Sequence, residues 1–133
     1  MKSKISILLA VFALMLAALA CGAPAGVSNI YMANDKEGTN KTTSFAPTDT
    51  VYVFFDVSQI DAGTQFQIKW YALNVDGQDP NEPIATTDYD YNNESTILAH
   101  INSTGADGLP TGDYKVEIYM SDKKVGEQLF TVQ

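Results

Sequence analysis

Strict alternation of apolar and polar residues is the feature of this chain that most restricts its fold. It is cleanest over residues 65–72, where every second side chain is apolar: Phe66, Ile68, Trp70 and Ala72. Successive side chains of an extended strand point to opposite faces, so such a segment buries one face and leaves the other wet. The pattern recurs over residues 50–57, 96–101, 113–120 and 124–132, and more weakly over 28–32 and 83–89. The sequence therefore predicts about seven strands.

The segments between these runs favour turns. They are rich in Asp, Asn, Gly and Pro, as in residues 46–49, 76–81 and 105–112. From residue 27 onward, no window keeps helical spacing over three turns. Short strands at this spacing without helices favour an antiparallel sandwich. We therefore expect an all-β domain over residues 27–133.

Two aromatic residues narrow the type of sandwich. Trp70 occupies an inward position of the third expected strand, and Tyr114 opens the sixth, directly after the turn at residues 109–113. This arrangement resembles the buried tryptophan and the tyrosine corner of immunoglobulin-like and fibronectin-type domains. The resemblance implies an immunoglobulin-like antiparallel β-sandwich in which Tyr114 bonds back to the preceding turn. We expect these side chains to be buried: Phe66, Ile68, Trp70, Tyr114, Val116, Ile118 and Phe130.

The N-terminus has a different character. Lys2 and Lys4 precede an uncharged, mostly apolar run over residues 5–20, which ends in small residues and leads directly to Cys21, the one cysteine of the chain. A basic start, an apolar stretch and small residues indicate a secretory signal peptide. Ala18-Leu19-Ala20-Cys21 resembles the lipobox of bacterial lipoproteins, although Leu is commonest where Ala18 stands. The resemblance implies cleavage of a signal helix, residues 1–20, and acylation of Cys21.

Two other interpretations of this segment remain open. A plain signal peptide could precede an incidental cysteine, or the apolar run could be an uncleaved transmembrane helix. Its sixteen residues are fewer than the roughly 20 that span a bilayer, and no basic cluster follows them. We therefore expect residues 21–26 to form a lipidated cysteine with a short linker. The protein would be lipid-anchored at the cell membrane or outer membrane, on the extracytoplasmic side.

Charge limits the partners of such a domain. The chain has eight lysines, no arginine and sixteen acidic residues, and cleavage after residue 20 would remove two of the lysines. Nucleic acid binding requires basic residues that neutralise phosphates, so we expect no nucleic-acid partner. An acidic surface of this kind favours solubility or a basic partner.

The residues of catalysis and metal binding are scarce. The one histidine, His100, lies on the polar face of its expected strand, and the chain has no Gly-x-Ser-x-Gly motif. We therefore expect no enzymatic activity and no cofactor. Six acidic residues fall within residues 76–94. Calcium prefers carboxylate oxygens, so this segment is a candidate calcium site with Asp76, Asp79 and Glu82 as the expected ligands. The alternative is a solvated acidic edge.

Tyrosines opposite the expected core are candidates for binding. Tyr52, Tyr71 and Tyr119 fall on the polar faces of their strands, where tyrosine can stack on a sugar or anchor a protein partner. Tyrosines also pair across strands for purely structural reasons, and Phe54 on such a face could pack under a loop. We expect a binding or interaction module for a protein or glycan. The alternative is a structural or accessory component of a cell-envelope assembly.

Overall fold

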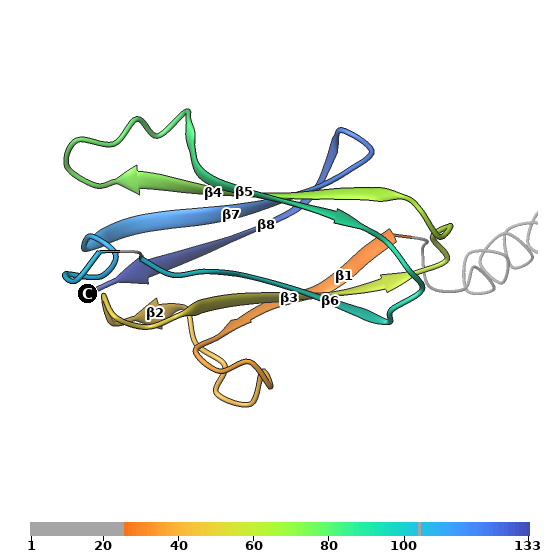
Figure 1. Ribbon diagram of the computed structural model, residues 1–133, viewed down its shortest axis with the longest axis horizontal. Coiled ribbons are helices and arrows are strands. Elements are labelled where there is room, and N and C mark those ends of the chain that lie inside the picture. The colour runs from red at the N-terminus through yellow and green to blue at the C-terminus, as the bar shows by residue number, and fades with distance from the viewer. Residues whose placement is uncertain (1–25, 104) are drawn as a thin grey trace, which may run out of the picture.

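The computed structural model describes residues 26–103 and 105–133. The expected signal helix over residues 1–20 and Cys21 lie outside this part of the chain. Two β-sheets pack face to face into an all-β sandwich (Figure 1). Within the described ranges, no helix is long and apolar enough to cross a membrane.

Eight strands build the two sheets. They are β1 Gly26–Ala33, β2 Ser44–Phe45, β3 Val51–Ser58, β4 Gln65–Asn74, β5 Pro83–Asp90, β6 Thr96–Ile101, β7 Gly112–Met120 and β8 Lys123–Val132. One sheet has the order β1-β3-β6 and the other the order β2-β8-β7-β4-β5. Strands β5 and β6, consecutive in the chain, are therefore edges of different sheets.

Each of the seven expected strands is present, and β2 is the addition. It has two residues, too few to show an alternation, and it pairs with β8 in parallel. Every other strand pair is antiparallel, as the sequence predicts. The fold is therefore the expected sandwich, with a short parallel strand at one edge.

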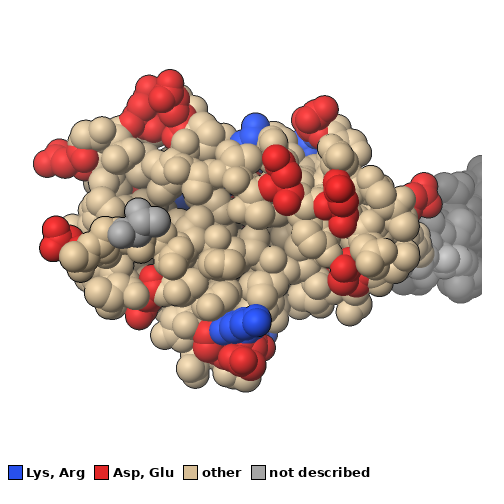
Figure 2. Space-filling view, in the orientation of Figure 1, with Lys and Arg blue, Asp and Glu red and all other residues tan. Residues whose placement is uncertain are grey.

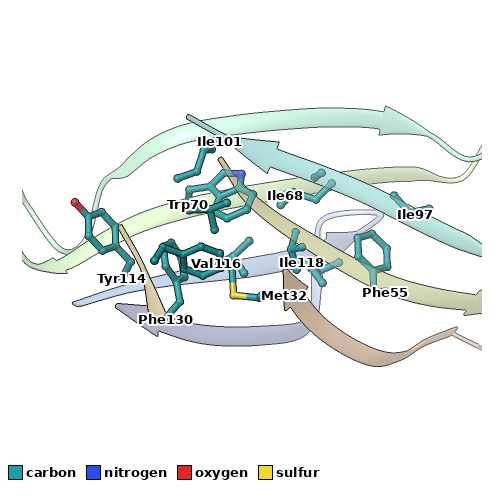
Figure 3. Packing of buried hydrophobic residues seen from close by; sticks show 14 of the residues in the cluster. Met32, Phe55, Ile68, Trp70, Ile97, Ile101, Tyr114, Val116, Ile118 and Phe130 are labelled. Atoms are coloured by element: carbon teal, nitrogen blue, oxygen red, sulfur yellow. The ribbon is translucent and has the colours of Figure 1, made fainter. Parts of the chain in front are cut away.

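The core lies between the sheets (Figure 3). Seven side chains expected to be buried are each at most 2% exposed: Phe66, Ile68, Trp70, Tyr114, Val116, Ile118 and Phe130. Trp70 and Tyr114 both pack on Phe130, with ring centroids 6.0 and 5.2 Å away. Burial of large apolar side chains, at about 1.5–3 kcal/mol each, is the main stabilising contribution to a domain without a disulfide.

Tyr114 forms the expected corner at the start of β7. Its hydroxyl donates a hydrogen bond to the carbonyl oxygen of Pro110. Burial of the ring raises the pKa of the Tyr114 hydroxyl above its ordinary value, so the group remains a donor at neutral pH. The bond ties the turn before β7 to the strand itself.

One aromatic ring on the outer face of the three-stranded sheet is buried by a loop. Phe54 is 6% exposed and stacks on Tyr31, with centroids 4.9 Å apart. Gly38, in the loop after β1, lies against both rings, and its φ of +71° is one that glycine adopts without strain. Phe54 thus packs under a loop, as its sequence position allowed.

Candidate functional site

The structure separates the three candidate tyrosines. Tyr71 on β4 and Tyr119 on β7 lie on the outer face of the five-stranded sheet. Tyr52 on β3 lies on the outer face of the opposite sheet, beside His100, with ring centroids 5.5 Å apart. The candidate surface formed by Tyr71 and Tyr119 therefore does not include Tyr52.

Lysines cover both tyrosines of the candidate surface. The Nζ atom of Lys69 lies 4.6 Å from the ring centroid of Tyr119, and that of Lys115 lies 5.0 Å from the ring centroid of Tyr71. Both contacts fall within the range of cation–π attraction. Tyr71, with Lys115 over its ring, is only 9% exposed, less than its place on a polar face suggested. The surface combines aromatic rings with fixed positive charges.

A buried carboxylate balances these charges. Glu117 on β7 is 6% exposed although it points away from the core. Its Oε1 atom lies 2.7 Å from Nζ of Lys115 and 3.5 Å from Nζ of Lys124. Lys124 also pairs with Glu127 at 2.6 Å. Charged groups this close to one another hold the side chains of the surface in fixed positions.

The environment of Glu117 shifts two pKa values. Burial acts to raise the pKa of Glu117, but hydrogen bonds from Lys115 and Tyr119 and the charges of the two lysines outweigh it and lower the pKa. The hydrogen bond that Tyr119 donates to Glu117, with its burial and the carboxylate charge, raises the pKa of Tyr119 to about 12. At neutral pH the carboxylate is ionised and the phenol is neutral.

An apolar groove continues this surface. It has a volume of about 430 Å³ and lies over the ends of β4, β7 and β8, lined by Leu73, Leu129 and Thr131 among others. Leu129 is 58% exposed, which is unusual for so large an apolar side chain on a strand. In the strand register Leu129 lies opposite Lys115, and Lys115 lies opposite Tyr71. One row across three strands therefore joins the groove to the tyrosines.

The acidic segment shows no assembled metal site. Asp76, Asp79 and Glu82 are all exposed in the loop between β4 and β5, and Asp79 accepts a hydrogen bond from the amide of Asn81. Across residues 26–103 and 105–133, no group of three or more His, Cys, Asp or Glu is placed to hold a metal ion. The structure therefore does not bring these three carboxylates together. His100 is exposed, as expected.

Comparison with known proteins bears on the fold. No protein-family model matches the chain, and no curated protein matches it. Among solved structures, an immunoglobulin-like protein from Pseudomonas aeruginosa superposes with a TM-score of 0.59 at 15% identity, covering 84% of this chain and all of that one. The fold is immunoglobulin-like. This assignment agrees with the buried Trp70 and the corner at Tyr114.

Two further structures are more distant. The alkylpurine DNA glycosylase AlkC from Pseudomonas fluorescens superposes with a TM-score of 0.50 at 11% identity, covering 84% of this chain and 31% of the glycosylase. A candidate lipoprotein from Bacillus anthracis has a TM-score of 0.41 at 15% identity, covering 84% of this chain and 76% of that one. At 11% identity, the similarity to the glycosylase is one of fold alone.

Proposed function

We propose that this protein is a lipid-anchored extracytoplasmic lipoprotein whose immunoglobulin-like domain is an interaction module. The module binds a protein or glycan partner through the outer face of the five-stranded sheet. No catalytic step is assigned to it.

The observation that carries this proposal is the row formed by Tyr71, Lys115 and Leu129. It places an aromatic ring, a cation and a largely exposed leucine side by side across β4, β7 and β8. Binding hot spots in protein interfaces are enriched in aromatic residues near apolar pockets, surrounded by polar groups. In this row the largely buried ring of Tyr71 supports Lys115, and Leu129 is the exposed contact for a partner. The groove of about 430 Å³ beside Leu129 supplies the pocket.

The ordering of the surface supports the same proposal. Tyr119 and Lys115 are both held by Glu117, with contacts of 2.6 and 2.7 Å. Side chains that are already fixed lose little conformational entropy when a partner binds. The expected anchor at Cys21 would keep the domain close to partners in the cell envelope.

The binding proposal can be tested by photo-crosslinking in intact cells. A benzophenone side chain placed at position 129 of the full chain should form an adduct with the partner, protein or glycan. The matched control is position 36, where Lys36 is exposed on the loop after β1. Adducts at both positions, or at neither, would contradict the proposed surface.

The anchor has a separate test. Cys21→Ser removes the thiol that acylation requires, so the chain should be released from membranes or remain unprocessed. Membrane fractionation with mass spectrometry of the N-terminal peptide distinguishes these results from the lipidated wild type. A Cys21→Ser chain that is processed and fractionates as the wild type does would contradict the anchor.

A further inference from the structure

The exposed edge of the five-stranded sheet combines three features that suit an added strand. Within the described part of the chain, strand β5 pairs with β4 on one side only, so its other side presents unpaired backbone groups. A cleft borders this edge, and acidic side chains follow it. We propose that β5 accepts an extended segment of a partner that alternates basic and apolar residues. This inference does not depend on the proposed tyrosine surface.

The cleft lies between the edges of the two sheets. It has a volume of about 530 Å³, and its walls combine apolar side chains with polar ones that make up more than half of its lining: Ala85, Ile101 and Leu109 with Thr87, His100 and Ser103. Ala85 and Thr87 alternate with exposed residues along β5 and are themselves half-buried. A strand added to β5 would direct every second side chain to this same side of the sheet. Apolar side chains at those positions would contact the apolar part of the cleft, formed by Ala85, Ile101 and Leu109.

The other face of β5 sets the charge of the partner. Asp88 and Asp90 are exposed on the outer side, where hydrogen bonds of 2.9 and 3.0 Å from Gln67 and Gln65 on β4 hold them in place. Acidic side chains cluster over β5 and the loop before it (Figure 2). Neither β5 nor β6 contains a lysine. Basic residues of the added strand would lie beside the two aspartates, as cross-strand pairs do.

The same charges disfavour a second copy of this chain at the site. Pairing β5 with its own copy would add two more aspartates and no basic residue to an edge that already carries Asp88 and Asp90. Strand addition by a basic amphipathic segment satisfies the backbone, the cleft and the charges together.

A synthetic peptide tests this proposal directly. The probe is a nine-residue peptide of alternating Lys and Val, acetylated and amidated, titrated by fluorescence anisotropy against the full chain in nanodiscs of uncharged phosphatidylcholine. The comparison peptide has the same sequence with every backbone nitrogen methylated, which keeps the charge and removes the donors of a β-ladder. We expect the first peptide to bind at low salt and the second to bind at least tenfold more weakly. Equal binding of the two, or binding of neither, would overturn the proposal.

Variants locate the site. Asp88→Asn with Asp90→Asn keeps an oxygen for each glutamine donor and should weaken binding about fivefold, the effect of losing two exposed ion pairs. Glu37→Gln with Asp49→Asn makes the same change of charge on other loops and should leave binding unchanged. When the peptide is added to the wild-type protein, backbone amide hydrogen exchange should slow in β5 and not in β1. This measurement does not depend on the folding of any variant. Equal weakening by both pairs of substitutions, or protection outside β5, would overturn the assignment.

Discussion

Tyr119 and Glu117, two residues apart on the outer face of β7, are joined by a hydrogen bond of 2.6 Å from the phenol to the carboxylate. Because strand side chains alternate, the two residues share a face and lie close enough to bond. The carboxylate also forms an ion pair with Lys115, so one buried anion contacts both an aromatic side chain and a cation. The candidate surface is held together by this group.

Replacing the anion should change the acid stability of the domain. The pKa of Glu117 is lower in the folded chain than its ordinary value of 4.5. The ionised carboxylate therefore stabilises the folded state above pH 4.5, and this stabilisation is lost as the pH falls through the folded pKa. We expect the free energy of unfolding of Glu117→Gln to fall less steeply than that of the wild type below about pH 5. Urea titrations at several pH values measure the free energy of unfolding of both proteins. Glu37→Gln, on an exposed loop, is the control, and parallel curves for wild type and Glu117→Gln would contradict the prediction.

The tyrosine corner should be measurable as one hydrogen bond. Tyr114→Phe removes the bond to Pro110 and keeps the ring stacked on Phe130, so it should cost about 1 kcal/mol of unfolding free energy. Tyr114→Leu also loses the ring contact and should cost more. Urea unfolding of the two variants separates these contributions. A Tyr114→Phe domain as stable as the wild type would show that the corner bond contributes nothing.

A glycine beside the corner should tolerate no side chain. Gly108 has a φ of +79°, and a Cβ atom there would overlap the carbonyl group of Pro47. Gly108→Ala should therefore destabilise the domain by about 3 kcal/mol or more, from backbone strain and overlap together. Gly63, with a φ of +87° and open space around it, is the control, and its Ala variant should lose only about 1 kcal/mol. Thermal unfolding measures the stability of both variants. Equal losses of stability in Gly108→Ala and Gly63→Ala would show that the contact with Pro47 is unimportant.

Alternation along the chain predicts which face of a strand is buried, but it carries no information on lateral neighbours. It therefore predicted the burial of Trp70 and Phe66 correctly. It did not predict that Lys115 covers Tyr71 or that Lys124 reaches Glu117, because these two contacts depend on the register of β7 with β4 and β8. Lys115 and Tyr119, by contrast, lie two residues from Glu117 on the same strand, so alternation alone places them on its face. The exposed Leu129 was visible in the sequence as an apolar residue at a polar position of its strand. That signal could have identified the groove.

The separation of the tyrosines has the same origin. Tyr52 and Tyr71 look alike in the sequence, since each occupies a polar position in an alternating run. Assignment of β3 and β4 to different sheets sends the two side chains to opposite sides of the sandwich. Only strand order, which depends on contacts distant in sequence, distinguishes them.

Hydroxyl-radical footprinting of the full chain tests the central claim most directly. Oxidation would be compared between the protein in intact cells and the purified protein. A partner on the five-stranded sheet should protect Leu129 and Tyr119 several-fold in cells. It should leave Tyr52 and Tyr31, which are half-buried like Tyr119 but lie on the opposite sheet, equally reactive in both samples. Equal oxidation of Leu129 and Tyr119 in cells and in the purified protein would contradict the account.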